Sequence, residues 1–380
     1  MSPLHRRPFG KDQLILGIET SCDDTACALV AGDGRVVSSV VSSQLEAHRP
    51  FGGVVPEIAS REHLRNWPAV SAEAFEKAGC TLDDVALVAA TRGPGLVGSL
   101  LVGLTLGRTL AFARSLPFFG VHHLEGHLYS PFLDADGAAG EEPMGHFVGV
   151  VVSGGHSSFF DVRAGRVTTL GETRDDAIGE AFDKIGKRMG LPFPGGPIVD
   201  ALAELVELPE EPSFPIPRCG DTLDVSYSGL KTQALQQIDR MERRGETTDL
   251  SSTYETLRRD GVRAVAEAVP ALELLAAVRQ AAVGQILDRL ESYYAAHASA
   301  PEVVAVSGGV AANRHLRREL TSWAERRGLD LRLVPLRFSG DNAAMIAHAA
   351  LLRSAYSSPD DPRRVEAFSR GSLGGDPRER

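Results

Sequence analysis

The protein has 380 residues and a formal net charge of −10, and 43% of its residues are hydrophobic and 24% charged. This composition predicts a folded globular chain of two lobes and excludes extensive disorder. The negative charge argues against a protein that binds nucleic acid without a partner, and four cysteines without a CxxC pair argue against a disulfide framework or a thiolate zinc site.

The sequence shows no sign of export or of a membrane anchor. Residues 1–11 are basic but lack the apolar core of a signal peptide. The apolar stretch 95–113 contains Arg108 and four glycines, so we expect a buried helix there rather than a membrane span. We therefore predict a cytoplasmic protein without membrane contact.

Three short strands separated by turns are predicted over residues 14–42, with a polar turn at 21–24 and a hairpin turn at 32–34. The same order returns over residues 147–170, where Gly154-Gly155 forms the first turn. A strand, a glycine loop and a helix follow each triplet, from residue 85 and again from residue 303. We interpret this repeated order as an internal duplication.

The remaining segments predict helices over 175–189, 271–294 and 343–352 from their apolar periodicity. An arginine-rich stretch, 314–337, is interpreted as a solvated helix face or, equally, as a nucleic-acid contact. The layout as a whole predicts an α/β protein with the duplicated fold of the actin-like ATPases (ASKHA), two lobes with a central cleft. We expect one lobe to hold 12–122 and about 335–355, the other 123–334, and 1–11 and 357–380 to be mobile tails.

Two hairpin turns, at 19–25 and 152–157, are candidates for phosphate binding. Small residues in a tight turn expose consecutive backbone N–H groups to an anion, although each turn alone would also fit an ordinary hairpin. A third element, 306–313, has a glycine pair before a helix, on which an adenosine could lie. There Asn313 could bind the nucleotide or merely cap the helix.

Three histidines within six residues, His122, His123 and His127, are the most distinctive feature of the sequence. His123 and His127 are four residues apart and share one face of a helix, so they could chelate one ion. Asp341 is the best candidate for a third ligand, with a helix N-cap as its alternative role. Two histidines and one carboxylate with open positions favour Fe²⁺, while Zn²⁺ and Mg²⁺ remain possible.

Two acidic positions allow a second role besides a solvated helix face. Asp183 and Asp200 could line the cleft as acceptors for hydroxyl or amine groups, with Gly196 allowing close backbone contact.

Several of these segments together resemble the tRNA N6-adenosine threonylcarbamoyltransferases, formerly described as sialoglycoproteases. The resemblance covers about residues 13–350 and rests on long motifs in order, among them GIETSCDDT, VHHLEGH, VSGGHSS, DDAIGEAFDKIGKRMGLPFPGGP, SGGVAANRHLR and SGDNAAMIA. It implies the actin-like fold. It also implies transfer of the threonylcarbamoyl group of L-threonylcarbamoyl-AMP to N6 of the adenosine adjacent to the anticodon in tRNAs that read ANN codons, with release of AMP.

The resemblance also implies roles for individual residues. It places a metal on His123, His127 and Asp341 and gives Asp23 a part in the transfer. The implied contacts with the adenylate, AMP or ATP are Val151, Val152, Ser153, Gly154, Gly155, Asp183, Gly196, Asp200 and Asn313.

The implied partners are tRNA, an inactive paralogue of the same fold and a small P-loop ATPase. Two alternative functions stay open from the sequence, a small-molecule O-carbamoyltransferase of the same fold and a nucleotide-gated binding protein. The latter would hold Mg²⁺ by carboxylates and water rather than by histidines.

Overall fold

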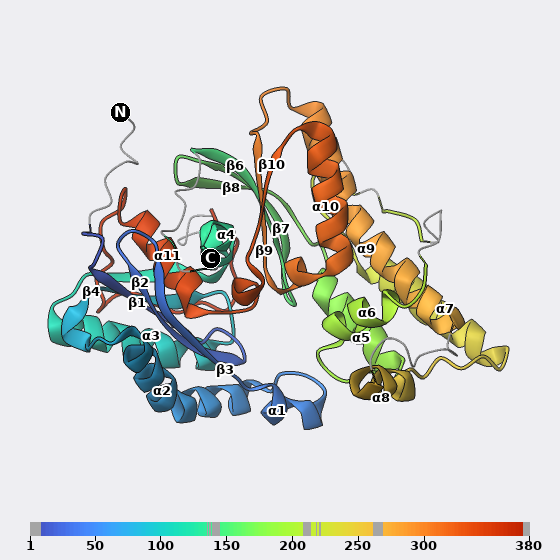
Figure 1. Cartoon of the computed structure of the whole chain (residues 1–380), viewed down its shortest axis with the longest axis horizontal. Coiled ribbons are helices and arrows are strands. Elements are labelled where there is room, and N and C mark those ends of the chain that lie inside the picture. The colour runs from blue at the N-terminus through green and yellow to red at the C-terminus, as the bar shows by residue number, and fades with distance from the viewer. Residues whose placement is uncertain are drawn as a thin grey trace.

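The computed structural model describes residues 9–134, 136, 138, 145–207, 214–217, 219, 222–260 and 269–374. Two five-stranded sheets, one in each half of the chain, carry the fold (Figure 1). The first sheet contains β1 (Leu14–Glu19), β2 (Asp24–Ala31), β3 (Val36–Ser43), β4 (Val85–Gly93) and β5 (Phe118–His122). The second contains β6 (His146–Val152), β7 (Ser157–Arg163), β8 (Arg166–Glu172), β9 (Val303–Ser307) and β10 (Asp330–Leu333).

The two sheets have the same topology. Their strand orders are β3-β2-β1-β4-β5 and, read from the opposite edge, β8-β7-β6-β9-β10. In each, the first three strands pair antiparallel and the last two join in parallel. The predicted duplication and the actin-like, two-lobed α/β fold are therefore confirmed.

The helices pack around the two sheets (Figure 1). In the first half they are α1 (Leu45–His48), α2 (Pro56–Ala78) and α3 (Val97–Arg114). In the second they are α5 (Ile178–Arg188), α6 (Gly195–Ala203), α7 (Ser228–Arg243), α8 (Ser251–Asp260), α9 (Val269–Ala296) and α10 (Arg314–Arg327). Two more helices, α4 (His123–Tyr129) and α11 (Ala343–Arg353), pack against each other, and between them they contact both sheets. No helix of the described ranges is both long and apolar enough to cross a membrane.

Strand β1 explains how the first sheet is packed. All six of its residues are buried, as expected for a central strand with helices on both faces. Leu16 and Ile18 join a core with α2 and α3, whereas Ile15 belongs to the large core that also contains α11. Because successive side chains of a strand point to opposite faces, the apolar run LILGI fills both cores at once.

Gly17 sets the position of α11 on this sheet. A Cβ atom at Gly17 would lie 2.2 Å from the carbonyl oxygen of Ala343, so only glycine lets the first turn of α11 approach the strand so closely. Helix α11 in turn packs against α4, which also contacts β6 and β9 of the second sheet. Figure 1 shows α4 between the two sheets, so the start of α11 and the whole of α4 lie at the junction of the halves.

Two helices begin later than the sequence predicts, because a polar side chain near each expected start binds backbone N–H groups instead of continuing the helix. Asp175 does not start α5; its carboxylate accepts hydrogen bonds from the backbone of Tyr227 and Ser228 at the start of α7. The helix expected directly after the glycine pair 308–309 is preceded by a short 3₁₀ turn, Gly309–Ala312, and α10 starts after Asn313, whose side chain caps it.

Residues 357–374 do not form the mobile tail that the composition predicts. Asp360 bridges to Phe118 and accepts from the backbone of Gly120, and the carbonyl of Leu373 accepts from Thr169. Val365 and Leu373 are buried. Polar composition concealed these few anchoring contacts, which depend on the folded surface of both halves. Residues 1–8 and 375–380, the rest of the expected tails, lie outside the described residues.

Candidate metal centre and nucleotide pocket

Helix α4 carries the two histidines of the predicted metal site. It follows β5 directly, and the side chain of His122 caps it by accepting from the backbone N–H of Leu124. His122 therefore has a structural task, whereas His123 and His127 lie on one face and are both buried. The expectation that spacing four would align this pair on a helix is confirmed.

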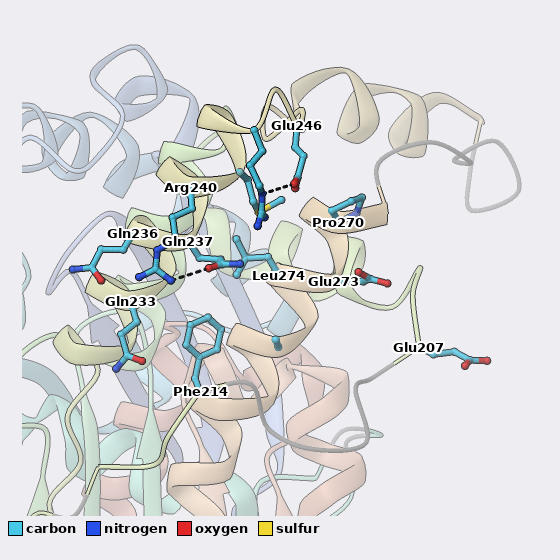
Figure 2. A pocket seen from close by; sticks show the side chains of 13 residues that line it. Glu207, Phe214, Gln233, Gln236, Gln237, Arg240, Glu246, Pro270, Glu273 and Leu274 are labelled. Carbon is cyan, nitrogen blue, oxygen red and sulfur yellow. Dashed lines mark hydrogen bonds and ion pairs between the residues drawn. The ribbon is translucent and has the colours of Figure 1, made fainter.

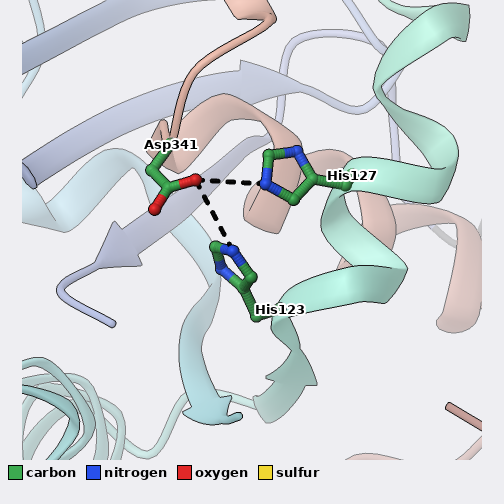
Figure 3. Close-up of side chains that lie close together, drawn as sticks. All are labelled: His123, His127 and Asp341. Carbon is green, nitrogen blue, oxygen red and sulfur yellow. Dashed lines mark hydrogen bonds and ion pairs between the residues drawn. The ribbon is translucent and has the colours of Figure 1, made fainter. Parts of the chain in front are cut away.

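Asp341 completes a triad with these histidines (Figure 3). Its Oδ1 lies 3.1 Å from Nε2 of His127 and 3.5 Å from Nε2 of His123. The candidate ligand atoms of the three residues all lie within 4.8 Å of one another. The cap of α11 is not Asp341 but Asn342, whose side chain accepts from the backbone of Met345. The carboxylate of Asp341 is thus directed to the histidines rather than used by the helix.

Glu19, at the end of β1, holds His123 from behind. Its side chain is fully buried, and Oε2 lies 3.2 Å from Nδ1 of His123 and accepts from the hydroxyl of Thr91 at 2.5 Å. The backbone N–H of Ser21 donates to its other oxygen. A histidine whose Nδ1–H is held by a carboxylate offers Nε2 to a metal in a fixed direction.

No role for Glu19 is predicted from the sequence, where its only signal is one acidic residue at the end of an apolar run that indicates a central strand. A buried charge of that kind needs a partner.

The electrostatics of the triad fit a divalent cation. Burial lowers the pKa of His123, but Asp341 and Glu19 outweigh it and raise the pKa to about 9. Burial raises the pKa of Asp341, and His123 and His127 more than reverse this, so that pKa lies far below its usual range. Two carboxylates that stabilise positive charge at one buried imidazole will also stabilise a metal ion in place of the proton. The donor set and its burial therefore suit the predicted ion.

The first hairpin turn lies beside this triad and not in the nucleotide pocket described below. The hydroxyl of Ser21 is 3.2 Å from Nδ1 of His123. Burial, and the nearby charge of Asp341, raise the pKa of the Asp23 carboxyl. The same two causes raise the pKa of Asp24 to about 7. The turn thus places two poorly solvated carboxyl groups next to the candidate metal site.

A cavity of about 380 Å³ lies in the second half, between α5, α6 and the start of α10. Five of the predicted substrate contacts line it, and they come from segments far apart in the sequence: Gly154, Asp183, Gly196, Asp200 and Asn313. Its remaining walls are mainly glycine, proline and apolar residues, with Arg314 as the one cation in the lining. Such a cavity, largely apolar with a few convergent polar groups, is typical of a small-ligand site.

The polar groups of this cavity are already partly engaged. Oδ1 of Asp183 accepts from the backbone N–H groups of Gly195 and Gly196, at 2.6 and 3.2 Å. Oδ1 of Asn313 caps α10, which leaves its amide nitrogen as a donor for a ligand. Asn313 therefore caps α10 through its side-chain oxygen, as one of the two predicted roles required, and its side-chain nitrogen remains available for a ligand.

The second hairpin turn connects the cavity with the triad. Val151 and Val152 are fully buried in β6 and can offer only backbone groups. Ser153 closes the turn, since its hydroxyl accepts from the N–H of His156. A Cβ atom at Gly154 or Gly155 would meet no atom within 4 Å, so both glycines border open space.

His156, which lies within this turn, faces the candidate metal triad, and the sequence alone gives no indication of that role. Its ring centroid lies 6.3 Å from that of His123. Burial, and the two histidines of the triad, lower the pKa of His156 to about 4. Its imidazole is therefore neutral at physiological pH and does not add a positive charge beside the triad.

A second, larger cavity of about 630 Å³ lies between α7 and α9 (Figure 2). Its lining mixes three glutamines with Arg240 and Arg244 and with Glu246 and Glu273, so charges of both signs are present. None of the predicted site residues lines it.

Comparison with known proteins shows the family of the chain. A family model described as tRNA N6-adenosine threonylcarbamoyltransferase matches residues 35–348. A relative of that name from Geobacter sulfurreducens is 44% identical over 336 residues, 88% of this chain and 90% of the relative. One from Thermus thermophilus is 42% identical over 355 residues, 93% of this chain and 97% of the relative. None of these relatives supports the small-molecule carbamoyltransferase or the nucleotide-gated binding protein.

Solved structures with low sequence identity support the fold alone. HypF from T. kodakarensis superposes with a TM-score of 0.56 at 13% identity, over 92% of this chain and 48% of that one. A full-length HypF in a phosphate- and nucleotide-bound form gives 0.53 at 12% identity, over 92% and 57%. The family model and these relatives span most of the chain. The chain therefore belongs to the family of tRNA N6-adenosine threonylcarbamoyltransferases.

Proposed function

We propose that this protein transfers the threonylcarbamoyl group of L-threonylcarbamoyl-AMP to N6 of the adenosine adjacent to the anticodon in tRNAs that read ANN codons, and releases AMP. The observation that carries the proposal is that one hairpin turn, 153–156, joins the candidate metal triad to a cavity of nucleotide size. A mixed anhydride of this kind has its adenosine at one end and its reactive carbonyl at the other, so it needs two such adjoining sites.

The adenylate binds in the cavity, and its reactive end points to the triad. Asn313 and Asp200 hold the nucleoside against the Gly309 backbone, and Asp183 keeps the Gly195-Gly196 amides in place. Gly154 and Gly155 let the phosphate approach the backbone of the turn, because no side chain fills the space. Val151, Val152 and Ser153 contribute backbone N–H and carbonyl groups of the same turn.

We further propose that His123, His127 and Asp341 hold one divalent cation, Fe²⁺ in preference to Zn²⁺ or Mg²⁺. Two imidazoles and one carboxylate leave open positions, the donor set that ferrous iron commonly has in proteins. When bound, the cation supplies Lewis-acid stabilisation for negative charge on the carbamoyl or phosphate oxygens.

Asp23 is the proposed acceptor of the proton that the attacking adenosine amine loses. Burial raises the pKa of its carboxyl, which makes the carboxylate a stronger base than in water. Asp24 lies next to it with a pKa of about 7 and is the alternative acceptor. Separate Asp23→Asn and Asp24→Asn variants distinguish them by which one lowers kcat at saturating substrate.

The lobes are proposed to divide as the sequence predicts, with 12–122 and about 335–355 in one and 123–334 in the other. Each sheet with its own helices supports this division. A cytoplasmic location fits four cysteines that are all free. We also propose that the protein works with tRNA, with an inactive paralogue of the same fold and with a small P-loop ATPase.

The decisive experiment is a transfer assay with purified chain, proposed partners, synthetic L-threonylcarbamoyl-AMP and unmodified tRNA, with metal analysis of the same sample. We expect AMP release that matches modified adenosine, and about one bound metal per chain. His127→Ala should lose both the metal and the transfer while its circular dichroism stays that of the wild type. Wild-type turnover by a folded, metal-free His127→Ala protein would refute the role of the triad.

A further inference from the structure

A buried arginine on α9 directs its hydrogen bonds to a single helix of the nucleotide cavity. The side chain of Arg279 is 1% exposed. It donates to the carbonyl oxygens of Asp200 and Ala203 at 3.1 and 3.3 Å, to Oδ1 of Asp200 at 2.8 Å and to Oε1 of Glu204 at 2.5 Å. All of these acceptors lie at the C-terminal end of α6.

Helix α6 is consequently held by charge at both ends. At its N-terminus the carboxylate of Asp183 accepts from Gly195 and Gly196, and at its C-terminus the guanidinium of Arg279 binds the last carbonyl groups. Anions at the start and cations at the end of a helix are both favourable. A helix of nine residues needs such support, since helices of this length are marginal on their own.

Asp200 carries this support across the cavity. Its Oδ1 binds Arg279, and its Oδ2 accepts from the backbone N–H of Arg314 at 3.1 Å. Asp200 and Gly196 of α6 and Asn313 and Arg314 at the start of α10 all line the cavity. The chain of contacts from Arg279 through Asp200 to Arg314 therefore fixes α6 against the start of α10.

We propose that Arg279 is a positioning residue of the nucleotide cavity, which holds α6 against the start of α10 and sets the orientation of Asp200 without touching the ligand. The proposal rests on the proposed function in one respect, namely that this cavity binds the adenylate. Arg279 itself lines no part of the cavity in the described residues.

The test compares Arg279→Lys with a matched arginine of the same helix. Lysine keeps the positive charge but cannot reach Asp200 and the end of α6 together, because it lacks the planar fork of donors. Arg289→Lys is the control: Arg289 is also buried and donates to the carbonyls of Asp224 and Pro217, away from the cavity. AMP affinity is measured by calorimetry, the melting temperature by circular dichroism, and KM and kcat by the transfer assay.

We expect Arg279→Lys to weaken AMP binding about tenfold, because Asp200 and the end of α6 are no longer held in the position that the ligand needs. The KM for L-threonylcarbamoyl-AMP should rise by a similar factor, while kcat changes little. Arg289→Lys should lower the melting temperature about as much as Arg279→Lys does, and should keep the wild-type AMP affinity. Should Arg279→Lys fail to fold, the double variant Arg279→Gln/Glu204→Gln, which removes one charge of each sign, takes its place.

The experiment distinguishes a failure of the positioning role of Arg279 from a failure of the proposed nucleotide cavity. AMP affinity within twofold of wild type in the folded Arg279 variant would overturn the positioning role and leave the proposed function intact. A wild-type protein that does not bind AMP at all, or that binds it equally well after Asp183→Ala, would instead overturn the nucleotide cavity on which the inference rests.

Discussion

At the scale of single residues, Glu19 supports the proposed metal triad from the side of His123. It fixes the direction of His123 through Nδ1 and is itself held by Thr91. We predict that Glu19→Gln lowers the metal affinity about 10- to 100-fold, the usual effect of removing such an outer carboxylate. Competition titration with a chelator measures it. Thr91→Ser, which keeps the hydroxyl donor, is the control and should retain wild-type affinity; equal affinity in Glu19→Gln would contradict the role.

Gly154 gives a second residue-scale prediction, on the phosphate turn. Valine there should fill the open space that the anion needs, and should weaken AMP binding at least about tenfold. The melting temperature should change little, because a Cβ atom at this position meets no atom within 4 Å. Gly229→Val, at a glycine with equally open surroundings but outside the cavity, is the control. Unchanged calorimetric affinity in folded Gly154→Val would count against the turn.

At the scale of elements, the ion pairs around α6 should make its packing sensitive to acid. The hydrogen bonds from Arg318, and then those from Arg279, lower the pKa of Glu204 to about 2, below its usual 4.5. The unfolded chain therefore takes up a proton first as the pH falls. The stabilisation by Glu204 is complete above about pH 4.5 and is lost progressively between about pH 4.5 and 2.

Glu204→Gln should thus be less stable than the wild type at pH 6, and the difference should shrink toward pH 2. Urea unfolding at several pH values in chelator measures this difference. Glu57→Gln removes an exposed pair with Arg61 on α2 and should show almost no difference at any pH. A difference between Glu204→Gln and wild type that does not depend on pH would show that the pairs around Glu204 do not stabilise α6.

At the scale of the whole molecule, the protein offers little positive surface to tRNA. The net charge is −10, and most arginines of the 314–337 stretch are engaged within the chain. Arg318 binds Glu204, Arg327 binds Glu291, and Arg317 donates to two backbone carbonyls. Because phosphate contacts supply most of the affinity for nucleic acids, a partner should complete the tRNA surface.

The exposed apolar face of α2 and α3 is our candidate surface for the paralogue. Val97, Leu101 and Phe112 recur at helical spacing on α3, and Leu64 lies on the neighbouring α2; all four are 46–64% exposed. We predict that Leu101→Asp abolishes sedimentation with the paralogue and multiple-turnover tRNA modification, while AMP affinity stays unchanged. Leu336 is 64% exposed and lies on neither α2 nor α3, so Leu336→Asp should have no effect. Full multiple turnover by the lone subunit would refute the need for a partner.

Local patterns in the sequence predicted the elements and part of the chemistry. Apolar runs with turn residues between them specify the strands of both sheets, and a spacing of four places His123 and His127 on one helical face. The prediction of a mobile tail does not hold for residues 357–374, because a few buried side chains such as Val365 anchor this segment to a surface that forms only in the folded protein.

What the sequence by itself determined is the set of strands and helices, the duplication and the identity of most candidate groups, because these depend on periodicity and short-range hydrogen bonding. Only the tertiary structure decided which groups meet. Asp341 reaches the histidines because α11 packs on Gly17 and Asn342 takes the cap. Glu19 and Arg279 have no local pattern of their own, since each is defined by partners more than 70 residues away in the chain.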